Sequence, residues 1–146
     1  MKIYLTSDHG GFELKSKLRE HLESKGLEVE DLGPHELDPD DDYPDFARAL
    51  TNVMTGSSEH DARGIAICRS AQGMGMAINR VPKMRAAIAW NVEEARKSRQ
   101  HNDSNVLCLS ADHIDDATNL EITDTWLEEP FSGDERHARR IKKIDE

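Results

Sequence analysis

The sequence lacks an excess of positive charge and has no long apolar run. Its 29 Asp and Glu residues outnumber 19 Lys and Arg, which gives a formal net charge of −10 at pH 7. Such an acidic chain is poorly suited to bind nucleic acid or an anionic membrane. No apolar run approaches bilayer length, and the few residues before the first polar turn are too short for a signal peptide. We therefore expect a cytoplasmic protein.

Cysteine is also scarce. The two cysteines, Cys68 and Cys108, both lie in apolar runs, which favours reduced thiols over a disulfide framework. His35, His60 and His113 stand apart from one another, with no further ligand at the spacing of a metal site. The sequence therefore predicts no metal centre.

Short apolar segments alternate along the chain with segments of helical periodicity. The sequence contains no internal repeat. A polar loop over 34–42 is expected to be a solvated connection. This alternation predicts one domain over residues 1–146, a three-layer α/β/α sandwich around a five-stranded parallel sheet. The expected strands cover 2–6, 27–33, 64–68, 84–90 and 105–111, and the expected helices 12–25, 46–54, 73–80, 92–100, 114–128 and 136–144.

Ligand sites in such folds collect where the strands end. The first strand ends in Asp8 and His9, followed by two glycines and a helix start. Backbone amides at that point could face an anion. The alternative, which the local sequence slightly favours, is that Asp8 is simply the N-terminal cap of the helix.

The third expected strand ends in "AICRSAQGMGMA", residues 66–77. Small residues after Cys68 allow a tight turn whose amides can hold a phosphate or an enediolate oxygen. The same amides would favour a Cys68 thiolate. Free cysteines are also often small buried hydrophobes, so the local sequence leaves both interpretations of Cys68 open. Cys108 lies inside its strand and is expected in the core.

Two further groups of residues could carry chemistry. His101, before the fifth strand, could be a general acid or base near neutral pH, or a capping or surface histidine. Arg136 and Arg140 stand one helical turn apart and suit a phosphate. The alternative is a solvated helix whose arginines pair with its own acidic residues.

Several motifs in order carry a resemblance that runs nearly end to end. They are "SDHGGFELK", "DYPDFA", the cysteine-bearing loop, "INRVPKMRAA", "SRQHNDSNVL" and "FSGDERHARRIKKID". In these motifs the chain resembles the RpiB/LacAB sugar-phosphate isomerases, and within them the type B ribose-5-phosphate isomerases.

The resemblance implies a Rossmann-like sandwich and a cofactor-independent aldose–ketose isomerase of a phosphorylated sugar, ribose 5-phosphate by default. It also implies a homodimer or tetramer whose active sites lie at the subunit interface and are built from both chains. The C-terminal helix, about 135–145, would pack on or across the dimer.

The resemblance also implies roles for particular residues. Cys68 would be the base, His101 would assist ring opening, and Ser70 would place a hydroxyl near the substrate. Met74 stands where other members have a glutamate base, which makes this chain the cysteine type. The expected substrate-binding residues are Asp8, His9, Arg69, Ala71, Gln72, Gly73, Asn102, Arg136 and Arg140.

Three positions depart from the family pattern. Arg69 and Ala71 replace glycines, so a backbone with positive φ would be strained or absent there. Asp112 stands where an arginine is often found, and Arg69 could supply the missing charge. These departures keep other substrates open, such as galactose 6-phosphate or allose 6-phosphate, and a non-catalytic phosphosugar-binding module.

Overall fold

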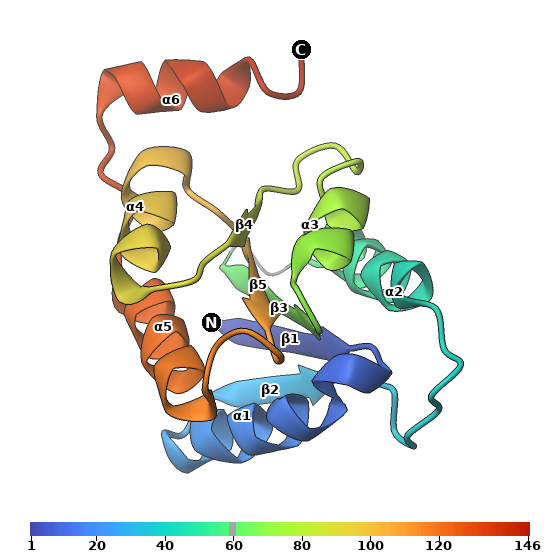
Figure 1. Ribbon diagram of the computed structural model, residues 1–146. Helices are drawn as coiled ribbons and strands as arrows, with labels where there is room; N and C mark the ends of the chain where they lie inside the picture. The colour runs from blue at the N-terminus through green and yellow to red at the C-terminus, as the bar shows by residue number, and fades with distance from the viewer. Residues whose placement is uncertain (59–60) are drawn as a thin grey trace.

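A computed structural model describes residues 1–58 and 61–146. Its parallel strands form one sheet in the order β2-β1-β3-β5-β4 (Figure 1). The strands are β1 Lys2–Ser7, β2 Glu28–Asp31, β3 Ala62–Cys68, β4 Ala86–Ile88 and β5 Val106–Ser110. The helices are the short 3₁₀ helix η1 His9–Gly11, then α1 Phe12–Ser24, α2 Tyr43–Gly56, α3 Gln72–Ile78, α4 Val92–Asn102, α5 Asp116–Glu128 and α6 Glu135–Lys142.

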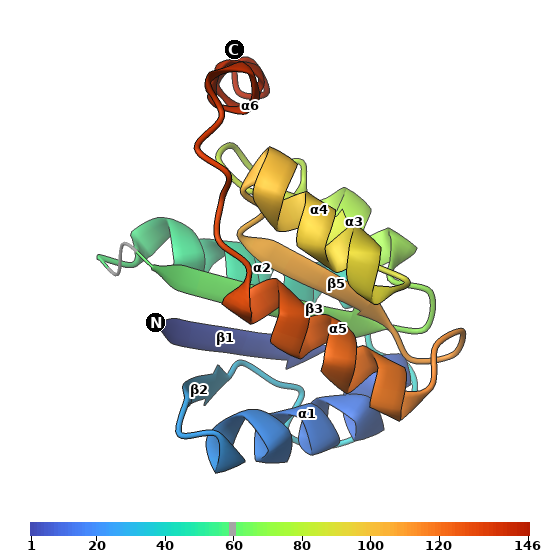
Figure 2. The ribbon, with the colours of Figure 1, turned by 90° about the vertical axis from the view of Figure 1, so that its left-hand side faces the viewer.

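Helices cover both faces of the sheet, as Figures 1 and 2 show. Because successive side chains of a strand point to opposite faces, β3 contributes side chains to two hydrophobic cores, one on each face of the sheet. Ile65 and Ile67 pack in the core beneath α1, α4 and α5. Ala66 and Cys68 pack in the core beneath α2 and α3. The predicted three-layer α/β/α sandwich is confirmed.

Some element boundaries differ from the sequence expectation. Helix α2 begins at Tyr43 because Pro44 lies in its first turn, where a missing N–H costs nothing. Strand β4 is only three residues long. It starts late because the Met84 N–H bonds back to the Val81 carbonyl oxygen at 3.1 Å, which closes a turn there.

A buried ion pair anchors the loop between β2 and α2. Lys15 Nζ, on a side chain only 3% exposed, lies 2.6 and 2.9 Å from the carboxylate oxygens of Asp31 and 2.7 Å from the Pro34 carbonyl oxygen. Burial alone would raise the pKa of Asp31, but hydrogen bonds from Lys15 and the Gly33 N–H hold it below its ordinary value. Helix α1 therefore fixes where the loop begins.

Helix α6 lies beyond α4, away from the sheet (Figures 1 and 2). The His137 ring packs against the His101 ring at 4.5 Å between centroids. The Ser132 N–H also donates to the Gln100 carbonyl oxygen at 3.2 Å. Among the described residues, no helix has the length and apolarity to cross a membrane.

Replacing Lys15 with methionine tests this anchor. Lys15→Met should lower the free energy of unfolding by about 3 kcal/mol at pH 7, because the Asp31 carboxylate stays buried without its cation. Since the folded-state pKa of Asp31 is lowered, the pairing stabilises fully above about pH 4 and is lost as acid protonates Asp31. The deficit measured by urea denaturation should therefore shrink in acid.

Lys17→Met is the matched control on the same helix. Lys17 pairs with Asp116 at the surface, where its side chain is 57% exposed, so its loss should lower the free energy of unfolding far less than the loss of Lys15 does. Equal losses in the two variants would contradict the account of the anchor.

Candidate functional site

Strands β1 and β3 bring two of the predicted segments together at the carboxyl edge of the sheet. Ser7 pairs with Ile67 in the parallel register, and the Asp8 N–H donates to the Ile67 carbonyl oxygen at 3.1 Å. Asp8 and His9 therefore follow β1 beside the point where Cys68 ends β3. This edge is the candidate site.

Asp8 caps the short helix η1, as one interpretation of the sequence held. Its Oδ1 accepts the Gly11 N–H at 3.1 Å, and the residue is 6% exposed. Burial raises the pKa of the Asp8 carboxyl, while the hydrogen bond from Gly11 opposes the rise. The cap fixes the carboxylate at the mouth of the site.

The two cysteines differ in their surroundings. Cys108 is fully buried inside β5, and burial raises the pKa of its thiol, so the prediction of a core cysteine is confirmed. Cys68 is 5% exposed and is the last residue of β3. It alone of the two adjoins a loop that leads to a helix start.

That loop, residues 69–71, carries a left-handed residue that is not glycine. Ala71 has φ 66° and ψ −16° and is fully buried. Of the two expected outcomes at Ala71, a strained left-handed backbone or none, the structure has the left-handed one. Arg69 is not among the described residues with positive φ. Ala71 precedes α3, whose first N–H groups lack partners within the helix. Ser70 Oγ accepts the Gln72 N–H at 3.4 Å.

Tyr43 closes one side of this loop and was not singled out from the sequence. A Cβ on Gly73 would lie 2.7 Å from Tyr43 Cζ, so the ring packs directly on the glycine backbone. The only sequence signal for Tyr43 was its place in the motif "DYPDFA". Its tyrosine starts α2 and remains 40% exposed.

Arg69 and Asp112 form an ion pair beside the loop. Arg69 Nη1 lies 3.3 Å from Asp112 Oδ2, with side chains 61% and 42% exposed. A Cβ on Gly10 would clash with Arg69 Cγ, so glycine lets the arginine stem cross η1. Both charges border a hollow of about 300 Å³ that His9 also lines. Arg69 thus offsets the negative charge of Asp112.

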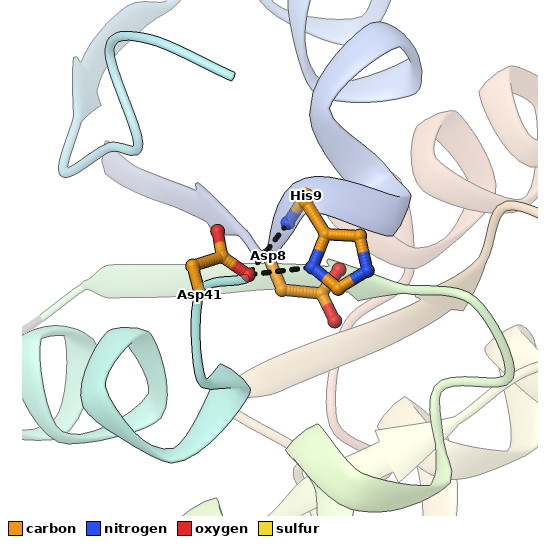
Figure 3. Close-up of side chains that lie close together, drawn as sticks. All are labelled: Asp8, His9 and Asp41. Atoms are coloured by element: carbon orange, nitrogen blue, oxygen red, sulfur yellow. Dashed lines mark hydrogen bonds and ion pairs between the residues drawn. The ribbon is translucent and has the colours of Figure 1, made fainter. Parts of the chain in front are cut away.

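His9 is held by a residue that the sequence did not point to. Its backbone N–H and its Nδ1 lie 3.1 and 2.7 Å from the same oxygen, Asp41 Oδ1 (Figure 3). The hydrogen bond to Asp41 raises the pKa of His9, Asp8 adds to the rise, and Arg69 opposes it. The loop over 34–42 was expected to be solvated, and at Asp41, whose side chain is only 8% exposed, that expectation is wrong.

Asp8, His9 and Asp41 also form a group that could ligate a metal ion. One donor atom from each lies within 4.8 Å of the others, and no second group of this kind occurs in the described ranges 1–58 and 61–146. Here Asp8 Oδ1 and Asp41 Oδ1 already accept N–H donors, and a protonated Nδ1 cannot bind a metal. The arrangement fits a hydrogen-bond network. Of the histidines considered from sequence, His60 lies outside the described residues.

The remaining predicted residues lie elsewhere in the chain. Helix α4 returns from β4 to the start of β5, which places its last residues, His101 and Asn102, at the amino edge of the sheet. The α6 arginines lie beyond them, away from η1 in both ribbon views. Arg136 pairs with Asp134 at 3.3 Å, as the solvated-helix alternative held. Within one chain this second group is not brought to Cys68.

Parallel α/β sandwiches form a class of proteins whose ligands bind beyond the carboxyl ends of the strands. In this chain a cysteine and the backbone amides of the following loop lie at that place. The family described as Ribose/Galactose Isomerase matches residues 3–144. Ribose-5-phosphate isomerase B of Mycolicibacterium paratuberculosis is 38% identical over 146 residues, which cover 100% of this chain and 91% of that protein. The chain belongs to the ribose/galactose isomerase family.

Solved structures agree with this family membership. The ribose 5-phosphate isomerase of Thermotoga maritima superimposes with a TM-score of 0.93 at 42% identity, covering 99% of this chain and 97% of that one. Ribose-5-phosphate isomerase B of Mycoplasma genitalium, with bound ribulose-5-phosphate, has a TM-score of 0.92 at 42% identity, covering 98% and 93%.

Substitutions at Ala71 test the left-handed turn. Ala71→Gly should leave the free energy of unfolding within about 1 kcal/mol of wild type, because relief of strain offsets the lost methyl burial and the added freedom of the unfolded chain. Ala71→Val should cost about 2 kcal/mol or more, since a β-branched residue disfavours positive φ and the position is fully buried. Urea denaturation measures both, and a valine variant as stable as wild type would contradict the turn.

Proposed function

We propose that the protein interconverts ribose 5-phosphate and ribulose 5-phosphate through an enediolate. The position of Cys68 carries the proposal: it ends the central strand directly before an amide-bearing loop, beside Asp8 and His9. Family membership supports the same reaction, as does the ribulose-5-phosphate bound to the neighbour from Mycoplasma genitalium.

The reaction follows from these groups. The Cys68 thiolate removes the proton from C2 of the open-chain aldose, the C–H electrons form a C1–C2 double bond, and the C1 carbonyl oxygen becomes negative. N–H groups of residues 69–73, which form the loop and the first residues of α3, stabilise that oxygen as its charge develops, with the Ser70 hydroxyl nearby. The thiol returns a proton to C1, and the C2 hydroxyl proton passes to O1. The step consumes no oxidant or reductant.

A second copy of the chain completes the site in this proposal. His101 and Asn102 are exposed at the amino edge and cannot act on a substrate held at Cys68 of the same chain. From a second copy, His101 would open the furanose ring and Asn102 would bind a hydroxyl. Exposed Met76 and Trp90 add apolar surface for such a partner to cover. We infer a homodimer, alone or paired into a tetramer, with α6 lying across it.

The phosphate would be held by cations from both chains. Among the residues that the structure describes, Arg140 makes no ion pair, and Arg136 pairs only with exposed Asp134. Both would reach the phosphate from the second copy, meeting His9 and Arg69 of the first. Planar guanidinium groups suit phosphate oxygens.

The Arg69–Asp112 pair favours a second candidate within the same reaction class. An acidic side chain beside the hollow changes which sugar phosphate fits best, so allose 6-phosphate or galactose 6-phosphate becomes the alternative substrate. A panel of these aldose phosphates with ribose 5-phosphate ranks them by kcat/KM. Thermal stabilisation by a sugar phosphate without any turnover would instead identify a binding module.

We further propose that residues 1–146 act as one domain in the cytoplasm, with a small sugar phosphate and a second copy of the chain as partners. The net charge of −10 supports the absence of nucleic acid from this set.

Cys68→Ala is the direct test of the base. The variant should lose at least about 100-fold in kcat for ribose 5-phosphate, because no other group takes the C2 proton. It should still be stabilised thermally by ribose 5-phosphate. A coupled assay of ketose formation measures the loss.

Cys108→Ala is the matched control. Cys108 lies in the same core and is fully buried, so this variant should keep its isomerase activity. Full activity in Cys68→Ala would show that another residue is the base.

A further inference from the structure

We propose that Asp41 is a positioning residue for His9: it fixes the proton on Nδ1 and leaves Nε2 free to bind the phosphate of the substrate. The inference deepens the proposed function and rests on it. Asp41 itself touches no substrate and acts only through His9.

The contact geometry sets the proton. One oxygen, Asp41 Oδ1, lies 3.1 Å from the His9 backbone nitrogen and 2.7 Å from its Nδ1. A carboxylate accepts hydrogen bonds and does not donate them, so Nδ1 carries a proton. The second ring nitrogen points away from Asp41 (Figure 3), and His9 lines the hollow beside Arg69.

Burial distinguishes Asp41 from the other acidic residues of its loop. Its side chain is 8% exposed, whereas Asp40 and Asp42 are exposed. Its Oδ2 is buried and has no hydrogen-bond partner among the residues that the structure describes. A buried carboxylate oxygen without a partner costs free energy. The structure bears this cost at Asp41, which agrees with a role of the Asp41 charge in holding and charging His9.

The charge of His9 decides what Nε2 can do. With Nδ1 committed to Asp41, neutral His9 presents a lone pair at Nε2, which repels a phosphate, and cationic His9 presents an N–H, which binds it. Asp41 and Asp8 favour the cation, and Arg69 from the β3–α3 loop disfavours it. The hollow is also lined by Glu13, Lys17, Asp112 and Asp116. Because the pKa of His9 is raised, the cation persists to higher pH.

The Asp41→Asn variant separates the negative charge of Asp41 from its hydrogen bonds. The amide oxygen can still accept both N–H groups, so the loop keeps its place while the negative charge is removed. In an NMR titration the pKa of His9 should fall by about half a pH unit or more. Asp40→Asn removes the same charge from the exposed neighbour and should leave the His9 titration unchanged. A pKa unaltered in Asp41→Asn would overturn the proposal.

A measurement on the unmodified protein covers the case in which the variant does not fold. Nitrogen chemical shifts of His9 above its pKa should show the proton on Nδ1. A proton on Nε2 would overturn the proposal.

Kinetics then connects His9 to the substrate. Asp41→Asn should raise KM for ribose 5-phosphate about 3- to 10-fold at pH 8, with kcat within about twofold, because a phosphate contact stabilises ground and transition states alike. The pH above which KM rises should move down with the His9 pKa. A fall in kcat at unchanged KM would contradict a role in phosphate binding.

The titration needs no turnover, so the two proposals fail separately. An inactive wild-type protein would overturn the isomerase function. An unshifted His9 in Asp41→Asn would overturn the role of Asp41.

Discussion

The parallel pairing of β1 with β3 is the constraint on which the candidate site depends. It sets the Asp8 N–H against the Ile67 carbonyl oxygen and so brings the residues after β1 beside Cys68. Side chains of a strand alternate between faces, so a slip of one residue would turn Cys68 into the opposite core. The register therefore decides both where the thiol lies and which loop it adjoins.

The loop between β2 and α2 is held at two points, and the second serves the site. Lys15 and Asp31 fix its start through a buried ion pair, and Asp41 fixes its end through His9. Between them the loop is largely exposed and contributes little core. Its fixed path delivers one buried carboxylate to His9, which links the anchoring of the loop to the charge of His9.

Local patterns were enough to predict the layers but not the contacts between distant segments. Helix α1 follows from Leu14, Leu18 and Leu22, which share one buried face, and the run around Cys108 predicted its burial. The contact of His9 with Asp41 spans 32 residues and leaves no periodic trace. The sequence left open whether Ala71 takes a strained left-handed conformation or none, because the local preference of alanine can be overridden where buried surroundings fix the backbone.

The central claim is that two chains build each site, Cys68 from one and His101 from the other. The direct measurement mixes Cys68→Ala with His101→Ala protein under conditions that exchange subunits. Each mixed dimer then holds one intact site and one doubly altered site, so activity should recover to about one quarter of wild type after random exchange. No recovery from two variants that remain dimeric and exchange subunits would contradict the account.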